Sequence, residues 1–292
     1  MLRAVSSAAA APDAKIAELR RRIGALERAG GSAGKSAGAG RALPFGVPEI
    51  DAALPWHGLA LGALHEISGP ARDGAALGFV SALLARLAGH GAGQGGAPGV
   101  VLWCRRLGAA YEAGNIYAPG LAAFGLDPSR LIVLGARHGR DVLWAMREGL
   151  SCPRLVAVVG EVEDAAIELT ASRRLQLAAE KSGVSCFLLR TTPVEGAQGD
   201  ITPENVEAPS AALSRWHVRA APSGPVPGLM APQAEQRWLG PGRLRWRAEL
   251  RRCRGGASAE WRMEWHHETG NFTLAAPLPN RSVEPAATRL AL

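Results

Sequence analysis

Short apolar runs that alternate with stretches of helical periodicity constrain this chain more than any other feature. The helical candidates span residues 75–88, 108–124, 140–149 and 161–182. The apolar runs between them are Leu64–Ile67, Val100–Trp103, Leu131–Leu134, Leu155–Val159 and Phe187–Leu189. Strands that are apolar on both faces and are linked through helices are typical of a parallel sheet covered by helices. The sequence therefore predicts an α/β core.

Beyond residue 190 the apolar residues recur with a period of two, which indicates half-buried strands. Three such segments lie at residues 215–220, 243–251 and 261–266. Gly255 and Gly256 predict a hairpin turn between the last two, and Phe272 and Leu274 predict one more edge strand. The Pro- and Gly-rich segment 221–242 is expected to be a loop. The core thus gains a C-terminal antiparallel part.

The ends of the chain carry its net charge of +7. Nearly all basic residues are arginines in a sequence that is also rich in Ala, Gly and Pro, so a codon bias accounts for the arginine content as such. Residues 1–41 carry +5, residues 42–200 carry −2 and residues 201–292 carry +4. A near-neutral middle between basic ends predicts a folded core whose appendages meet nucleic acid or an acidic protein face.

Residues 13–28 are predicted to form an amphipathic helix outside the core. Its apolar residues recur at steps of three and four, with three consecutive arginines in its middle. The residues of this candidate docking helix are Ile16, Leu19, Arg20, Arg21, Arg22, Ile23 and Leu26. Such a helix either folds back on its own core or docks on another protein, and both outcomes stay open.

The chain is therefore predicted to have a core with appendages at both ends. Residues 1–12 and 277–292 are expected to be disordered, and residues 29–42 form a flexible linker because Gly, Ala and Ser dominate there. The core domain covers residues 43–276, a length that suits one globular domain.

Nothing in the sequence predicts a membrane span or a secreted protein. No run of about eighteen bulky apolar residues occurs, and the Ala-rich start lacks the apolar stretch of a signal peptide. The cysteines lie far apart, without a C-x-x-C pair, as expected of thiols in a reducing cytoplasm rather than of a metal site. They are Cys104, Cys152, Cys186 and Cys253.

A glycine-rich turn after the first apolar run has the placement of a phosphate-binding loop. Gly69 and Gly74 match the spacing of G-x-x-x-x-G-K-[ST], whose backbone N–H groups wrap a phosphate at a helix N-terminus. The motif then needs Lys for the phosphate charge and a hydroxyl for Mg²⁺, whereas Ala75 and Ala76 supply neither, and Asp73 adds a carboxylate. This vestigial nucleotide loop consists of Gly69, Pro70, Arg72, Asp73, Gly74, Ala75 and Ala76. Its changes should harm hydrolysis more than binding.

The strand that would carry a metal-binding aspartate is eroded as well. After Leu155–Val159 a nucleotide-hydrolysing enzyme places Asp at the strand tip, where this chain has Gly160, with Glu161 one step late. We interpret Gly160 and Glu161 as a vestigial metal strand and predict no metal there. On these two motifs, a plain strand–turn–helix connection is favoured over a working ATP site.

A comb of arginines on the predicted strand at residues 243–251 and its turn is the candidate for DNA binding. Its members are Arg243, Arg245, Arg247, Arg251, Arg252 and Arg254. Basic strands can track phosphates with salt-dependent affinity. The alternative, favoured by the arginine-rich composition, is a solvated face. Trp246, Trp261 and Trp265 are expected on the opposite face, in the core.

Several stretches of the chain resemble the ImuA family, RecA-like accessory proteins of bacterial inducible mutagenesis. The stretches are residues 43–55, 58–70, 117–120, 124–128, 172–183 and 249–265. The resemblance covers nearly all of residues 43–275. It implies a RecA-like core and a role in error-prone translesion DNA synthesis, with ImuB, an inactive Y-family polymerase homologue, and an error-prone C-family DNA polymerase as partners.

The same resemblance implies further losses of catalytic groups. The position of RecA's catalytic glutamate falls near Arg105 or Arg106, and Arg190 and Thr191 stand where a glutamine of RecA relays the nucleotide state to DNA. We therefore predict a non-catalytic adaptor of the DNA-damage (SOS) response that needs no cofactor. The helix at residues 13–28 resembles a RecA helix that packs on a neighbouring protomer, so an oligomer and contacts with RecA or single-stranded DNA stay open.

Two other functions remain as alternatives: a weak DNA-dependent ATPase, and a regulator of RecA filaments or of cell division. A hydrolase has no support, because the sequence has no G-x-S-x-G elbow and no H-E-x-x-H motif. The run His266-His267-Glu268 lacks the spacing of a metal site.

Overall fold

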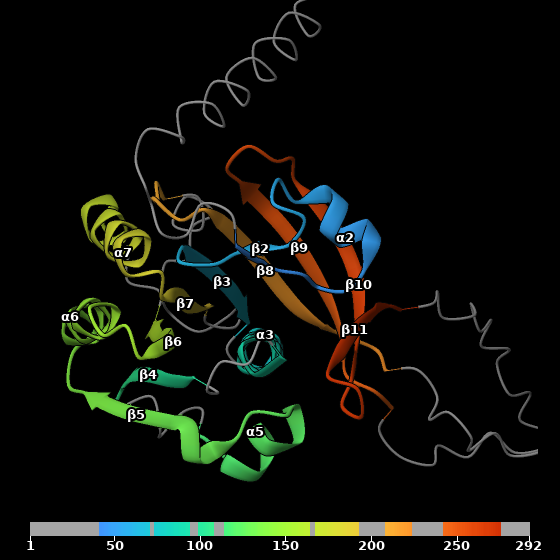
Figure 1. Cartoon of the computed structure of the whole chain (residues 1–292), viewed down its shortest axis with the longest axis horizontal. Helices are drawn as coiled ribbons and strands as arrows, with labels where there is room; N and C mark the ends of the chain where they lie inside the picture. The colour runs from blue at the N-terminus through green and yellow to red at the C-terminus, as the bar shows by residue number, and fades with distance from the viewer. Residues whose placement is uncertain are drawn as a thin grey trace, which may run out of the picture.

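A nine-stranded sheet with helices on both faces forms the body of the protein (Figure 1). The computed structural model describes residues 41–70, 73–93, 99–107, 114–163, 167–192, 208–223 and 242–275. Within these residues the sheet has the strand order β11-β10-β9-β8-β3-β7-β6-β4-β5, and a second sheet pairs β1 with β2. The predicted RecA-like α/β core with a C-terminal antiparallel part is confirmed.

The six strands from β8 to β5 run parallel to one another. They are β3 (Leu64–Pro70), β4 (Val100–Arg106), β5 (Leu131–Ala136), β6 (Leu155–Glu163), β7 (Ser185–Thr192) and β8 (Ser214–Ala221). The inner strands are apolar along most of their length because both faces of the sheet are covered. Each of the five apolar runs of the sequence falls in one of these strands.

Helices cover the two faces of the parallel strands in two pairs (Figure 1). On one face lie α3 (Ala75–Gly93) and α5 (Ala118–Phe124), and on the other lie α6 (Gly139–Leu150) and α7 (Leu169–Ser182). A short 3-10 helix, η1 (Pro128–Arg130), leads into β5. Each face has its own cluster of buried side chains, so the sheet separates two cores.

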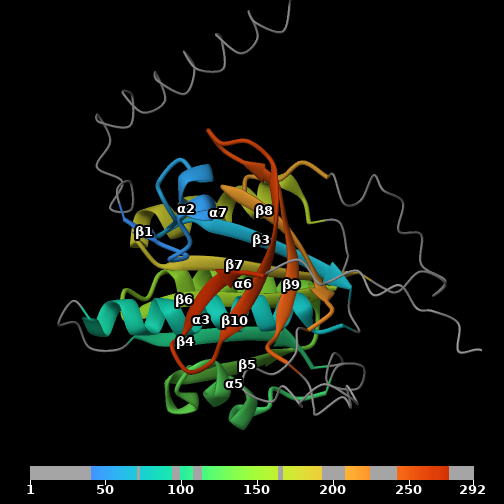
Figure 2. The ribbon, with the colours of Figure 1, turned by 90° about the vertical axis from the view of Figure 1, so that its right-hand side faces the viewer.

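The C-terminal strands extend the sheet antiparallel to β8. They are β9 (Arg245–Cys253), β10 (Ala259–His266) and β11 (Asn271–Leu274), and Figure 2 shows β9 and β10 beside β8. Buried side chains of β1 (Ala42–Leu43), α2 (Pro48–Ala53) and β2 (Leu59–Ala60) belong to the same core as those of these strands. Trp246 and Trp265 are fully buried in this core and Trp261 packs against it half-buried. The predicted placement of the tryptophans opposite the arginine comb is confirmed.

Two predicted helices are shorter than the sequence suggested. Of the helix expected at residues 108–124, residues 108–113 lie outside the described residues, and α5 begins at Ala118, beyond Gly114, whose φ of 77° does not fit a helix. The helix expected at residues 161–182 begins at Leu169, because β6 continues to Glu163 in register with β7. Conversely, α3 continues to Gly93, five residues beyond the predicted end.

The predicted terminal segments lie outside the described residues, including the docking helix 13–28 and the tail 277–292. Ala42, which the sequence placed in the linker, lies in β1 and pairs with Ala60. None of the helices in the described part of the chain has the length and hydrophobicity that a membrane span needs.

Candidate functional site

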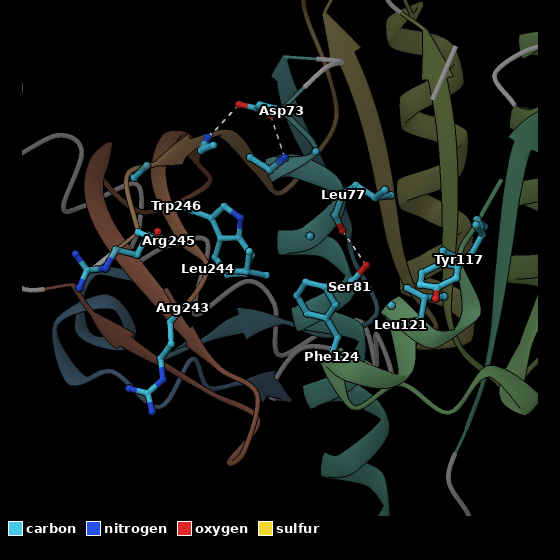
Figure 3. Close-up of a pocket in the computed structure, with 18 of the residues that line it drawn as sticks. Asp73, Leu77, Ser81, Tyr117, Leu121, Phe124, Arg243, Leu244, Arg245 and Trp246 are labelled. Atoms are coloured by element: carbon cyan, nitrogen blue, oxygen red, sulfur yellow. Dashed lines mark hydrogen bonds between the residues drawn. The ribbon is translucent and has the colours of Figure 1, made fainter. Parts of the chain in front are cut away.

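The side chain of Asp73 occupies the helix end at which a phosphate-binding loop would hold its anion (Figure 3). Its Oδ1 accepts a hydrogen bond from the backbone N–H of Ala75 at 2.9 Å, in the first turn of α3. Its Oδ2 accepts from the backbone N–H of Ala220 at 3.0 Å, on β8. A helix N-terminus attracts an anion because its first N–H groups lack partners within the helix. Here the chain supplies the anion itself.

The glycines and alanines of the predicted loop have structural tasks. Gly69 and Pro70 still belong to β3, in register with β7, so the predicted loop starts too early. A Cβ on Gly69 would collide with the carbonyl oxygen of Val218, which explains the glycine without a phosphate. The side chains of Ala75 and Ala76 are buried, and neither carries the ammonium or hydroxyl group that a phosphate-binding loop needs at these positions. Arg72 lies outside the described residues.

The vestigial metal strand holds a carboxylate that protein groups already bind. Trp103 Nε1 donates a hydrogen bond to Glu161 Oε1 at 2.6 Å, and Arg105 Nη2 lies 3.4 Å from Glu161 Oε2. Burial raises the pKa of Glu161, while the Arg105 charge and the Trp103 hydrogen bond act to lower it. Both carboxylate oxygens therefore have partners, and a cation approaching Glu161 would have to compete with the Arg105 guanidinium.

Gly160 does not stand at a strand tip, as the sequence suggested, because β6 continues three residues beyond it. A Cβ at this position would collide with the Met146 sulfur on α6. Gly160 thus allows α6 to pack closely against the sheet. Among the described residues, no group of His, Cys, Asp and Glu has an arrangement that could hold a metal ion.

An open cavity of about 550 Å³ lies beside this capped loop, between α3, α5 and the start of β9 (Figure 3). Its apolar lining includes Leu77, Tyr117, Leu121, Phe124, Leu244 and Trp246. Asp73 and Gly74 line one end, and Trp103 connects the cavity with the Glu161 cluster. Among the described residues that line the cavity, the two arginines, Arg243 and Arg245, point their guanidinium groups away from α3 (Figure 3).

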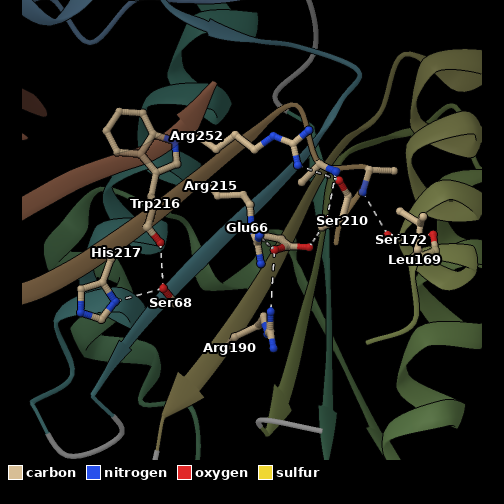
Figure 4. A network of polar contacts seen from close by, with 12 residues as sticks. Glu66, Ser68, Leu169, Ser172, Arg190, Ser210, Arg215, Trp216, His217 and Arg252 are labelled. Atoms are coloured by element: carbon tan, nitrogen blue, oxygen red, sulfur yellow. Dashed lines mark hydrogen bonds and ion pairs between the residues drawn. The ribbon is translucent and has the colours of Figure 1, made fainter. Parts of the chain in front are cut away.

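A second polar cluster, on the other face of the sheet, joins three parallel strands through the buried Glu66 (Figure 4). Glu66 Oε2 lies 2.9 Å from Arg215 Nε and 3.9 Å from Arg190 Nη1, and Ser210 donates its hydroxyl hydrogen to Oε1. Arg252 Nη1 donates to the carbonyl oxygen of Ser210 at 3.5 Å. Arg190, which the resemblance placed at the nucleotide relay of RecA, therefore holds a structural carboxylate between β3, β7 and β8.

The arginine comb lies on a surface of mixed charge. Four of its members form ion pairs: Arg243 with Glu264 and Glu268, Arg245 with Glu264, Arg247 with Glu260, and Arg251 with Glu249. Arg252 contacts Ser210, as described, and Arg254 is exposed in the hairpin turn. Glutamates on β9 and β10 thus offset much of the positive charge. DNA binding by the comb stays a prediction.

Comparison with known proteins identifies the family. No family model matches the chain. Two curated proteins named Protein ImuA, from the strains NA1000 and CB 15 of Caulobacter vibrioides, are each 38% identical to it over 251 residues. The match covers 84% of this chain and 93% of each relative. The chain belongs to the ImuA family. The match extends over the length of a whole ImuA protein rather than over one shared motif.

In this member of the ImuA family, the structure brings together two of the predicted sites and leaves two apart. The capped loop and Glu161 both lie at the carboxyl ends of parallel strands, on the α3 face. The arginine comb lies on the outer face of β9 instead, and the docking helix lies outside the described residues. Within the described residues, the capped loop and Glu161 are thus separate from the arginine comb.

Sequence reasoning missed two pairings that the ImuA-family structure shows. Arg105 was interpreted only as the loss of a glutamate, whereas it lies against Glu161 on the neighbouring strand. Adjacent parallel strands end at the same sheet edge, and this rule was a usable signal. Glu66 was overlooked within the apolar run Leu64–Ile67, although a charge in a buried strand needs partners such as Arg215.

Proposed function

We propose that this ImuA-family chain is a non-catalytic RecA-like adaptor in DNA-damage-induced, error-prone translesion synthesis. Its expected partners are an ImuB-like inactive polymerase homologue and an error-prone C-family DNA polymerase. The observation that carries the proposal is the carboxylate of Asp73 at the start of α3, where a nucleotide phosphate would bind. Membership of the ImuA family supports the setting in mutagenesis.

Three electrostatic features support the loss of catalysis. Asp73 places a negative charge beside the cavity, which repels a triphosphate. Ala75 and Ala76 offer neither a cation nor a hydroxyl, and their side chains are buried. The Arg105 guanidinium lies against the carboxylate of Glu161, near the expected metal position. Charge neutralisation provides most of the catalysis of phosphoryl transfer, so these charges support a chain without an ATP-dependent switch.

Genetic complementation tests the proposal with a matched pair of variants. Gly74 has a φ of 64° and open space around its Cβ position, and both Asp and Asn tolerate this conformation. Gly74→Asp adds a second carboxylate to the loop, and Gly74→Asn adds the same shape without the charge. In a strain that lacks the gene, wild type and both variants should restore damage-induced mutation frequency equally.

Two results would contradict the proposal. If Gly74→Asn restores mutagenesis and Gly74→Asp does not, an anionic ligand acts at the loop and the chain resembles the DNA-dependent ATPase considered above. If the deletion leaves damage-induced mutation frequency unchanged, the chain does not serve mutagenesis. Co-purification of the full chain with the ImuB-like homologue from damaged cells tests the partner separately.

A further inference from the structure

The strand β5 forms an open edge of the nine-stranded sheet and is apolar throughout (Figure 1). Within the described residues it pairs only with β4, so its outer backbone N–H and C=O groups face away from the sheet. Its sequence, Leu131–Ala136, contains no charged residue and no proline. Natural proteins usually protect an edge strand with charges, prolines or a covering element, because an open edge pairs with other chains.

Two large apolar side chains of β5 are exposed on opposite faces of the strand. Ile132 is 54% exposed and Val133 is 49% exposed. Their register partners on β4, Leu102 and Trp103, point into the two separate cores, so neither face of the edge is covered at this place. Leu107, 55% exposed, extends the apolar rim beyond the end of β4.

The opposite edge of the same sheet shows how this protein protects a strand. β11 is only four residues long and carries polar side chains. Arg86 donates hydrogen bonds to the Asn271 side chain at 2.6 Å and to the Gly270 carbonyl oxygen at 3.0 Å. A hydrogen bond joins Thr273 to His266 on β10. Within the described residues, β5 has no comparable protection.

Charges at the two ends of β5 select the partner. Arg130 precedes the strand, in an ion pair with Asp127 at 3.5 Å. The exposed Arg137 and Arg140 follow the strand, and Arg140 Nε lies 3.7 Å from Asp141 Oδ1 in a solvent-exposed ion pair. If β5 paired with β5 of a second copy of this chain in antiparallel orientation, Arg130 of one copy would lie beside Arg137 of the other. In a parallel pair, each arginine would lie beside the same arginine of the other copy. Like charges opposite each other destabilise a strand pair. An acidic partner would meet attraction at the same positions.

We propose that β5 accepts an extended segment of a different protein, which adds a strand to the sheet, packs apolar side chains on Ile132 and Val133, and carries carboxylates where it meets Arg137 and Arg140. Strand addition of this kind derives affinity from backbone hydrogen bonds and specificity from alternate side chains. The surface is distinct from the vestigial nucleotide region and from the arginine comb.

Synthetic peptides test the proposal on the full chain. Each contains five alternating Val and Thr residues with three Glu residues at either its N- or its C-terminal end, and matched peptides carry Lys in place of Glu. Binding is measured by fluorescence anisotropy, and amide hydrogen exchange locates it. One of the two acidic peptides should bind and protect residues 131–136, and the Lys peptides should bind at least about tenfold more weakly.

Exposed-site variants make the test specific. Val133→Lys should weaken the acidic peptide about tenfold or more, since it protects the edge with a charge. Arg137→Glu combined with Arg140→Glu should reverse the preference toward the Lys peptide. Leu177→Lys, at a position 55% exposed on α7, is the matched control and should bind like wild type.

Three results would overturn the proposal. One is an acidic peptide that fails to bind or protects residues elsewhere. Another is Val133→Lys binding as well as wild type. The third is a concentration-dependent dimer of the chain alone that protects residues 131–136, which would assign the edge to a second copy.

Discussion

Replacing Asp73 with alanine removes the two hydrogen bonds that fix the vestigial loop. Loss of the cap on the first turn of α3 costs about 1 kcal/mol. Loss of the second bond, to the Ala220 N–H near the surface, costs about 0.5–1 kcal/mol. We therefore expect Asp73→Ala to lower the free energy of unfolding by about 2 kcal/mol. For a domain of this size, that corresponds to a fall in Tm of about 4–8 °C.

Calorimetric melting of the full chain measures this shift. Asp73→Asn keeps one acceptor oxygen and should lose about half as much stability. Asp127→Ala is a matched control, because Asp127 accepts from the Ser129 N–H at 2.9 Å without joining a second strand; it should lower Tm less than Asp73→Ala. A Tm fall of less than about 1 °C for Asp73→Ala would refute the assigned role of the carboxylate.

Asp73→Ala should also free the N-terminus of α3 to bind an external anion. Without the Asp73 carboxylate, the Ala75 N–H at the start of α3 has no side-chain acceptor. Millimolar inorganic phosphate should then raise the Tm of Asp73→Ala and leave that of wild type unchanged, because a helix N-terminus binds anions. Equal stabilisation of both proteins would show that Asp73 does not occupy that position.

Three further predictions concern other parts of the chain. Burial lowers the pKa of His65 to about 4, so between about pH 6.5 and 4 the unfolded chain binds the extra proton. Stability should therefore fall as pH falls, by up to about 3 kcal/mol, and urea titrations should show a flatter profile for His65→Gln. Arg105→Met leaves the Glu161 carboxylate without its cation and should lower stability by about 3 kcal/mol at pH 7. The loss should be smaller at pH 5, because burial raises the pKa of Glu161 and removal of the Arg105 charge raises it further; an equal loss at both pH values would contradict the pairing. Leu19→Asp with Leu26→Asp should abolish co-purification with the ImuB-like homologue at unchanged Tm, and retained binding would assign the helix to another role.

Much of the fold was predictable because burial leaves a periodic trace in the sequence. Every apolar run predicted a strand that exists, and the alternation after residue 190 predicted the antiparallel part. Helix starts were less accurate where a backbone feature interrupted the pattern. α5 begins beyond Gly114, and pairing with β7 extends β6 to Glu163. Such register-dependent effects depend on a neighbouring strand that is remote in sequence.

At the candidate site, too, some features could be predicted from the sequence and others could not. The absence of a loop lysine and of a metal-binding aspartate was plain from Ala75 and Gly160. The contacts that replace a bound nucleotide and metal could not be predicted, because they join residues far apart in the chain: Asp73 with Ala220, and Arg105 with Glu161. The open edge at β5 also required the strand order, since Leu131–Leu134 has the sequence of a buried strand.

Titration of the full chain with ATP and Mg²⁺ in an isothermal calorimeter tests the central claim most directly. A nucleotide region filled by its own carboxylate and guanidinium predicts no saturable heat and no rise in Tm at millimolar nucleotide, with or without single-stranded DNA. Magnesium-dependent binding in the micromolar range, together with ATP turnover that rises on addition of DNA, would contradict it.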